Sequence, residues 1–200
     1  MQGLVYIKHC RVIHCDLKPE NLMYTDSRRK AVKIIDFGSS SSFGMNTFTY
    51  VQSRFYRCPE VVMGLPYDYQ ADMWSLGCIV AELFCGRPIF PGIDENELLE
   101  FHVLMCGNPP QHMIDRCSKR AKFFNVSEGY KLIRSPQSRL VNISNKNSAS
   151  LYQVLFPARF NNAKAAQMRN NEIHAMLSRE EQLLVDFVRG CLQIDPQQRM

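Results

Sequence analysis

The most informative part of the sequence lies near the N-terminus and reads His14-Cys15-Asp16-Leu17-Lys18-Pro19-Glu20-Asn21. The tripeptide Asp36-Phe37-Gly38 begins fifteen residues after Asn21, and Tyr56-Arg57-Cys58-Pro59-Glu60 comes farther along the chain. A lone Asp-Phe-Gly tripeptide occurs by chance and carries no weight. The three motifs in this order and at these separations form a specific combination. Their carboxylate, amide and ammonium groups are therefore the first candidates for chemistry.

This combination resembles the signature set of the protein kinases, which transfer the γ-phosphate of ATP. Phosphoryl transfer requires neutralised charge and a hydroxyl aimed in line with the phosphate. In that chemistry Asp16 would accept or orient the substrate hydroxyl, and Lys18 would place a positive charge at the transferred phosphate. Asn21 and Asp36 are the expected ligands of ATP-bound Mg²⁺, a hard cation that prefers oxygen. The structural alternative is a buried ion network around Asp16 without catalysis.

The resemblance narrows to the C-terminal lobe of the CMGC group of kinases, and there to the dual-specificity tyrosine-phosphorylation-regulated kinases (DYRK family). Cys15 stands where most kinases have arginine between the catalytic-loop His and Asp, as it does in that family. Residues 49–60 resemble the family's activation segment almost position for position. Residues 107–111 and 118–122 resemble the insert of the branch related to Pom and Yak kinases. The resemblance covers most of the 200 residues and is weakest over residues 136–176.

The resemblance implies a regulatory role for the activation segment. Tyr50 corresponds to the tyrosine that the nascent kinase phosphorylates on itself, and Arg54 and Arg57 are the expected partners of its phosphate. Ser53 corresponds to the hydroxyl residue that contacts the catalytic Asp and Lys. Phe48 departs from the family, because family members commonly carry a second tyrosine there. This departure excludes a doubly tyrosine-phosphorylated segment.

Three further residues have structural roles by the same resemblance. Glu60 and Arg199 correspond to a buried ion pair that ties the activation segment to the last helices. Breaking such a pair costs about 3–5 kcal/mol. Asp72 corresponds to a carboxylate at the start of a helix that braces the backbone of the catalytic loop.

The predicted fold class is mainly α, a kinase C-terminal lobe with a short β-hairpin near the catalytic loop and Asp36. Residues 22–24 and 31–35 form the expected hairpin. Residues 71–85 are apolar on nearly every face, which is typical of a buried central helix. Reciprocal capping, in which a cap residue and a glutamate three residues later bind each other's backbone N–H groups, is predicted at Asp94 and Ser178. The polar residues 135–150 are predicted to form a surface loop or insertion.

The chain is interpreted as one partial kinase domain spanning residues 1–200. It has a catalytic loop at 14–21, an activation segment at 36–60 and a CMGC-type insert at about 107–177. Its ten glycines contain no G-x-G-x-x-G spacing, whereas a kinase needs such a loop over the phosphates. We therefore expect the N-terminal lobe and the final helix to be missing, and the 200-residue fragment alone to be inactive.

Composition excludes several classes of protein. No apolar run approaches the ~20 residues of a membrane-spanning helix, and the N-terminus lacks the pattern of a secretory signal. The eight scattered cysteines predict a reduced, intracellular protein of the cytoplasm and/or nucleus. His9, Cys10, His14 and Cys15 are possible metal ligands, but no second cluster accompanies them, so a metal site is not expected there.

The net charge is +5, and residues 116–134 account for all of it, with six Lys and Arg residues and one Glu. Such a run is usually a solvated face, and the alternative is a docking patch for acidic or phosphorylated partners. The balanced remainder of the chain argues against nucleic acid as a partner.

Two functions remain open at this point. The first is a protein serine/threonine kinase, dual-specificity through autophosphorylation on Tyr50, that uses ATP and Mg²⁺ to phosphorylate protein substrates. The second is a non-catalytic interaction module that binds substrates or regulators without turnover. Because Asp16, Lys18, Asn21 and Asp36 are all present, the sequence favours the first function for the parent protein.

Overall fold

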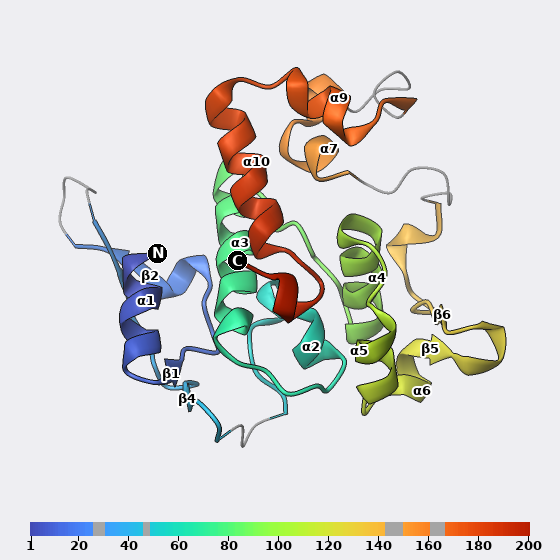
Figure 1. Cartoon of the computed structure of the whole chain (residues 1–200), viewed down its shortest axis with the longest axis horizontal. Coiled ribbons are helices and arrows are strands. Elements are labelled where there is room, and N and C mark those ends of the chain that lie inside the picture. The colour runs from blue at the N-terminus through green and yellow to red at the C-terminus, as the bar shows by residue number, and fades with distance from the viewer. Residues whose placement is uncertain (26–30, 46–48, 143–149, 161–166) are drawn as a thin grey trace.

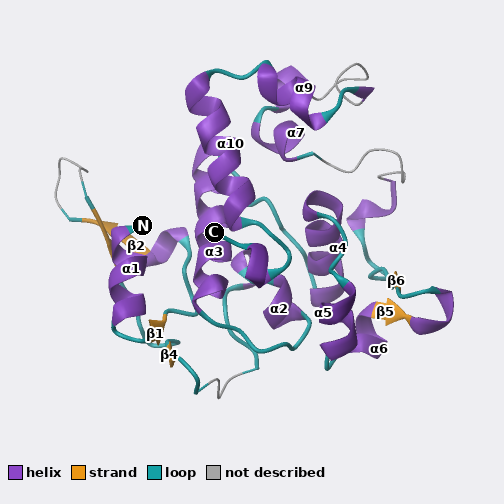
Figure 2. Ribbon diagram, in the orientation of Figure 1, coloured by secondary structure: helices purple, strands orange, loops and turns teal. Residues whose placement is uncertain are grey.

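The computed structural model describes residues 1–25, 31–45, 49–142, 150–160 and 167–200. The chain is mainly α-helical, as predicted, with short strands near the N-terminus and between residues 124 and 132 (Figure 2). The α-helices are α1 (Gln2–His9), α2 (Pro59–Val62), α3 (Tyr69–Cys85), α4 (Glu95–Cys106), α5 (Gln111–Arg116), α6 (Arg120–Phe123), α7 (Leu151–Leu155), α8 (Pro157–Phe160), α9 (Asn170–Ala175) and α10 (Arg179–Cys191). The strands are β1 (Val12–Ile13), β2 (Leu22–Tyr24), β3 (Val32–Ile34), β4 (Ser41–Ser42), β5 (Phe124–Asn125) and β6 (Lys131–Leu132).

The centre of the molecule is α3, and α10 packs directly against it (Figure 1). Asp68 caps the start of α3 by accepting from the backbone N–H of Gln70 at 2.8 Å, and Gly86 ends it with a left-handed φ of 76°. At Gly77 the two helices approach so closely that a Cβ atom would lie 2.6 Å from Cβ of Cys191. Glycine is therefore needed at this crossing. The elements near the N-terminus lie on one side of α3, and α4 to α6 lie on the other (Figure 1).

The prediction that the central helix is buried on nearly every face holds for most of α3 but is wrong for its last turn. Trp74 and Cys78 are buried, whereas the Leu83 and Phe84 side chains are 71% and 47% exposed. Phe84 keeps one aromatic neighbour, Phe156, with ring centroids 5.2 Å apart. An all-apolar pattern cannot reveal this difference, because the neighbouring elements decide which faces are covered.

Two antiparallel strand pairs shape the region around the catalytic loop. In the first, β2 pairs with β3 in the register Leu22↔Ile34, which confirms the predicted hairpin. In the second, β1 pairs with β4 and joins the residues before the catalytic loop to those after Asp36. The backbone N–H of Ile35 also donates to the carbonyl of Asn21 at 3.0 Å. These pairings bring the motif at 14–21 next to the motif at 36–38.

The predicted reciprocal capping is confirmed at Ser178 and wrong at Asp94. Ser178 and Glu181 bind each other's backbone N–H groups at the start of α10. Asp94 accepts from the N–H of Glu97 at 2.8 Å, but the fully buried Glu97 side chain does not return to Asp94. It accepts instead from the N–H of Ile93 and from Arg139, because a buried carboxylate needs a cationic partner.

The residues that follow Arg134 form a turn with exposed residues Pro136 and Gln137, as predicted for a surface loop, but two serines of this segment are buried. Ser135 and Ser138 are 3% and 7% exposed, and both bind the side chain of Glu100 on α4. Arg139 binds Glu97 of the same helix. The buried carboxylates of α4 supply hydrogen-bond acceptors that composition does not reveal, so this polar segment packs against the helix. Residues 143–149 of the predicted loop lie outside the described residues.

In the part of the chain that the structure describes, none of the helices is long and apolar enough to cross a membrane. All eight cysteines are free thiols.

Candidate active site

The carboxylate of Asp16 is the centre of a polar cluster in the catalytic loop. Its Oδ1 accepts from the hydroxyl of Ser53 at 2.7 Å and from the Ser53 N–H at 3.1 Å. Its Oδ2 accepts from Nζ of Lys18 at 2.8 Å and from Nδ2 of Asn21 at 3.3 Å. Lys18 Nζ also donates to the Ser53 hydroxyl at 3.3 Å. The structure thus brings four of the predicted site residues into direct contact.

The hydrogen bonds of this cluster keep Asp16 and Lys18 charged at neutral pH. Partial burial opposes ionisation of Asp16, but hydrogen bonds from Lys18 and Ser53 outweigh it and lower the pKa of the carboxyl. The hydrogen bond to Asp16 in turn raises the pKa of the Lys18 ammonium. The loop therefore presents an ionised carboxylate beside an ammonium. The carboxylate can accept a hydrogen bond from a hydroxyl, and the ammonium can attract an anion to the same place.

Asp72 at the start of α3 fixes the backbone of the catalytic loop. Its two carboxylate oxygens accept from the N–H groups of His14 at 2.7 Å and Cys15 at 3.0 Å. Cys15 has a left-handed φ of 63°, which non-glycine residues seldom adopt, and its carbonyl accepts from the N–H of Gln52 at 2.9 Å. Burial raises the pKa of Asp72 to about 6. The position of Asp72 agrees with the bracing role that was expected for it.

Asn21 and Asp36 are the candidate oxygen donors for a metal ion. The amide nitrogen of Asn21 donates to the carbonyl of Asp16 at 2.8 Å and to its carboxylate, which leaves the amide oxygen as the free end for a metal. Asp36 is exposed, has a φ of 60°, and accepts from the N–H of Gly38 at 3.3 Å. One amide and one carboxylate fit Mg²⁺, which takes its other ligands from phosphates and water.

A group of three or more His, Cys, Asp or Glu residues able to hold a metal is not found among the described residues. Asn21 and Asp36 remain the candidate metal-binding pair.

The activation segment places Tyr50 against a buried arginine. The guanidinium carbon of Arg57 lies 4.0 Å from the centre of the Tyr50 ring. The guanidinium of Arg57, and to a smaller degree that of Arg54, lowers the pKa of the Tyr50 hydroxyl, while the Tyr50 side chain is 63% exposed. Arg54 also donates to the carbonyl of Ile93. Phe48 lies outside the described residues.

Glu60 and Arg199 form a buried ion pair across the lobe. The two guanidinium nitrogens lie 2.7 and 3.0 Å from the two carboxylate oxygens, and neither side chain is more than 1% exposed. Arg199 also donates to the carbonyls of Gln70 and Gln193. The contact was expected from the resemblance, and its complete set of partners is visible only in the structure.

Gln52 is a site residue that the sequence did not reveal. Its amide nitrogen donates to the carbonyl of Ala71 at 3.0 Å and to the Ser75 hydroxyl at 2.9 Å, and its amide oxygen accepts from the N–H of Cys58 at 3.0 Å. The side chain is buried, and φ is 66°. A polar residue between Tyr50 and Ser53 gives no periodic signal, so only the three-dimensional contacts identify Gln52 as one of the residues that link this segment to α3.

The sequence pattern of the protein kinase domain matches residues 1–200, and the chain belongs to this family. Among individual proteins, it is 36% identical over 200 residues to dual specificity tyrosine-phosphorylation-regulated kinase 3 of Mus musculus, covering 100% of this chain and 33% of that protein. It is 41% identical over 195 residues to the kinase mbk-2 of Caenorhabditis elegans, covering 95% of this chain and 22% of that protein.

A third relative is the DYRK-family kinase pom1 of Schizosaccharomyces pombe, 36% identical over 202 residues, which include 100% of this chain and 16% of pom1. The resemblance to the dual-specificity kinases is therefore confirmed over the whole chain. The chain spans 16–33% of the length of these three relatives.

Proposed function

We propose that this chain is the catalytic-loop lobe of a protein kinase that transfers the γ-phosphate of ATP to serine and threonine hydroxyls of protein substrates. The Asp16 carboxylate, held 2.7 Å from the hydroxyl of Ser53 and 2.8 Å from the ammonium of Lys18, is the observation that carries the proposal. Phosphoryl transfer needs a group that accepts a hydrogen bond from the substrate hydroxyl, and a positive charge near the phosphate. Asp16 and Lys18 supply these two groups at one place.

Each residue of the cluster has a defined task in this proposal. Asp16 binds the substrate hydroxyl and receives its proton, and Lys18 neutralises the charge that develops on the transferred phosphoryl group. Ser53 keeps Asp16 and Lys18 in register through its hydrogen bonds to both. Asn21 and Asp36 hold Mg²⁺, which when bound with ATP spreads the negative charge of the phosphates.

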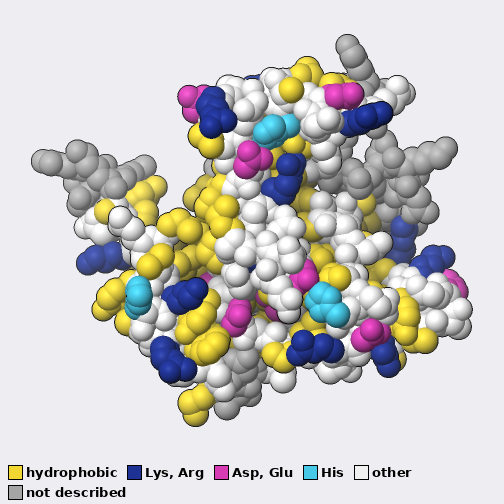
Figure 3. All heavy atoms as spheres, in the orientation of Figure 1, with side chains coloured by type: hydrophobic (Ala, Val, Ile, Leu, Met, Phe, Trp, Pro, Cys, Tyr) yellow, Lys and Arg dark blue, Asp and Glu magenta, His cyan; other side chains and the backbone are white. Residues whose placement is uncertain are grey.

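The proposal assigns residues 14–21 to the catalytic loop, residues 36–60 to the activation segment and residues from about 107 to 177 to the insert. A nucleotide also needs a glycine-rich loop, which these 200 residues do not contain. Exposed hydrophobic side chains of α1 and the β2–β3 hairpin, among them Val5, Tyr6 and Met23, offer a surface for a nucleotide-binding lobe. Figure 3 shows hydrophobic side chains gathered on that side of the molecule.

Regulation by Tyr50 and an intracellular location complete the proposal. The kinase phosphorylates Tyr50 on itself, and Arg54 and Arg57 order the loop around the new charge. The free thiols fit a reducing compartment, where ATP is also available.

The test is phosphorylation of a protein substrate by the full-length protein that contains these residues, with Mg²⁺ and ATP. Asp16→Asn keeps the shape of the side chain and removes its charge. We expect this variant to lose activity by at least ~100-fold, because general-base groups contribute that much or more. Asp115→Asn, the same change at an exposed position of α5, serves as the matched control and should keep full activity.

Equal turnover by the Asp16→Asn variant and the wild type would reject the catalytic proposal. Absence of turnover in both, with retained binding of a substrate protein, would favour the non-catalytic interaction module instead. Unfolding curves of the two variants establish that each is folded before activity is compared.

A further inference from the structure

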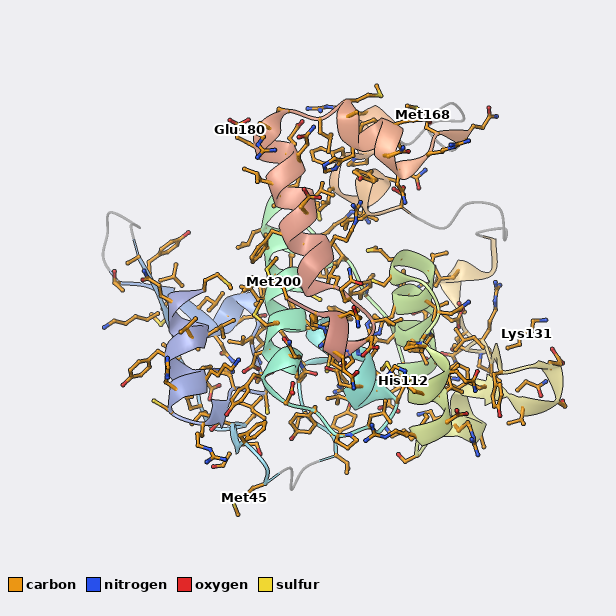
Figure 4. The ribbon with its side chains drawn as sticks, in the orientation of Figure 1. Met45, His112, Lys131, Met168, Glu180 and Met200 are labelled. Carbon is orange, nitrogen blue, oxygen red and sulfur yellow. The ribbon has the colours of Figure 1, made fainter. Side chains whose placement is uncertain are left out.

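Two aromatic rings stack between the end of β4 and the start of α3. The ring centroids of Phe43 and Tyr69 lie 4.9 Å apart, and their planes are 9° from parallel. The Phe43 side chain is 42% exposed. Met45, which follows two residues later and is 67% exposed, is labelled at the lower edge of the molecule in Figure 4. The stack therefore reaches the surface at a place that the proposed catalytic cluster does not use.

Two exposed cations accompany this stack. Nζ of Lys8, in the last turn of α1, lies 5.6 Å from the centre of the Tyr69 ring. The guanidinium carbon of Arg11, just before β1, lies 5.8 Å from the centre of the Phe43 ring. Both cations are exposed, and in the described part of the chain neither forms an ion pair with a carboxylate. Their positive charges are therefore available to a partner.

The backbone holds these groups in fixed positions. The N–H of Arg11 donates to the carbonyl of Lys8 at 2.9 Å, and the carbonyl of Arg11 accepts from the N–H of Phe43 at 2.9 Å. Arg11 itself has a left-handed φ of 59°. Figure 3 shows basic and hydrophobic side chains next to each other over the end of α1 and around β4. A surface that is ordered before binding loses less entropy when a partner arrives.

We propose that Lys8, Arg11, Phe43 and Tyr69 form a docking surface for an acidic segment of a partner protein that carries an aromatic residue. Carboxylates of the partner pair with the two cations, because opposite charges across an interface fix its register and its specificity. The aromatic side chain of the partner packs at the exposed edge of the Phe43–Tyr69 stack, an arrangement that aromatic rings favour. This docking goes beyond the proposed function and involves none of its catalytic residues.

The occupied ring faces favour a peptide over a nucleic acid. A base binds by stacking on an open aromatic face. Here Phe43 and Tyr69 already stack on each other, and each also has a cation within 5.8 Å of its centre. Carboxylates need only the N–H groups of the two cations, which remain exposed.

The basic segment at 116–134 carries more positive charge but suits an acidic partner less. Nζ of Lys119 and Nζ of Lys122 lie 3.0 and 2.6 Å from the carboxylate of Glu95. Lys131 lies 3.5 Å from the carboxylate of Glu128. An acidic segment would have to displace these carboxylates, whereas at Lys8 and Arg11 it meets cations without such partners.

The first experiment measures the binding of a fluorescent peptide, with one phenylalanine between two runs of glutamate, to the full-length protein. Lys8→Gln combined with Arg11→Asn removes both charges, and asparagine adopts a left-handed φ more readily than most residues. We expect about tenfold weaker binding. Lys131→Gln combined with Arg179→Gln removes the same charge from exposed positions elsewhere and should bind like the wild type (Figure 4).

The second experiment tests the aromatic contact. Phe43→Ser should weaken binding of the same peptide by about fivefold. A peptide with alanine in place of phenylalanine should bind the wild type more weakly, but should bind the Phe43→Ser variant no more weakly than the original peptide does. Phe84→Ser is the matched control, because Phe84 is a similarly exposed phenylalanine (47%) at the other end of α3. Unfolding curves establish that each variant is folded.

The docking surface is disproved if the wild type does not bind the peptide, or if the variant at positions 8 and 11 binds it as tightly as the wild type. An equal loss in the variant at positions 131 and 179 would show a general effect of charge and would also disprove it. Tighter binding of an oligothymidine than of the peptide would overturn the assignment to a protein partner. None of these measurements requires ATP or turnover, so their outcome is independent of the proposed function.

Discussion

Arg199 and Arg57 are both buried arginines, but they differ in how fully their guanidinium groups are paired with hydrogen-bond acceptors and carboxylates. Every guanidinium nitrogen of Arg199 has an acceptor, and two of them contact the carboxylate of Glu60. Arg57 binds two backbone carbonyls, its Nη1 has no hydrogen-bond partner among the described residues, and the carboxylate of Glu95 lies 3.8 Å from Nη1. The charge of Arg199 is therefore fully paired, whereas that of Arg57 is paired only at a distance.

The difference follows from how a buried charge is compensated. A guanidinium taken out of water needs both hydrogen bonds and an opposite charge, and only a paired carboxylate supplies the two together. Backbone carbonyls satisfy N–H groups without removing net charge. Arg199, whose guanidinium carbon also lies 5.2 Å from the centre of the Trp74 ring, is therefore the more completely compensated of the two charges.

The largest expected effect is the loss of the partner of Arg199. Glu60→Gln keeps the size of the side chain but leaves a buried cation uncompensated, so the free energy of unfolding should fall by about 3–5 kcal/mol. Urea unfolding followed by circular dichroism measures it, with Glu180→Gln as the control at an exposed position. A loss below about 1 kcal/mol would contradict the structural role of the pair.

The second prediction concerns His102, which packs beside Trp74 beneath Arg199. Burial, and then the charge of Arg199, lower the pKa of His102 to about 3 from its usual 6.5, and both of its ring nitrogens lack hydrogen bonds among the described residues. Below pH 6.5 the unfolded chain binds a proton at His102 and the folded chain does not. The free energy of unfolding therefore decreases as the pH is lowered. Between pH 7 and pH 5 this loss amounts to about 2 kcal/mol.

His102→Phe removes the titration, so its unfolding free energy should fall less than that of the wild type between those two pH values. The quantity to compare is the change in the free energy of unfolding between the two pH values, measured for both the variant and the wild type. Asp72, whose pKa burial raises to about 6, titrates in the same range with the opposite sign, because the folded state retains the proton longer. Equal pH dependence of the two proteins would refute the role of His102.

The smallest expected effect is the loss of the carboxylate near Arg57. Glu95→Gln should change the free energy of unfolding by less than about 1 kcal/mol, because two of its partners are partly exposed lysines and the third is not hydrogen-bonded to it. The same urea experiment measures it. If Glu95→Gln were as damaging as Glu60→Gln, the contrast between the two arginines would disappear.

The sequence predicted the site residues that lie within one motif. It missed the residues whose interaction partners are distant in the sequence and are brought close only by the fold. Asp16, Lys18 and Asn21 lie within six residues and meet in one loop, so their clustering could be expected. Lys119 and Lys122 look like any exposed lysines until α4 places Glu95 between them.

The burial of Ser135 and Ser138 was unpredictable for the same reason. These serines are polar and give no apolar pattern, and the carboxylates of Glu100 and Asp94 that bind them are visible only in the structure. The last turn of α3 shows the converse error, because Leu83 is apolar but is left 71% exposed by the described residues around it.

The contacts of Asp72 with the catalytic loop have a consequence for the order of events during protein synthesis. The carboxylate that holds the N–H groups of His14 and Cys15 is 58 and 57 residues later in the chain. At translation speeds of roughly 5–20 residues per second, the loop waits roughly 3–12 seconds for this partner. Until α3 has left the ribosome, the left-handed turn at Cys15 has no support from Asp72. The catalytic loop of a nascent chain therefore cannot adopt its final conformation before the central helix has been synthesised.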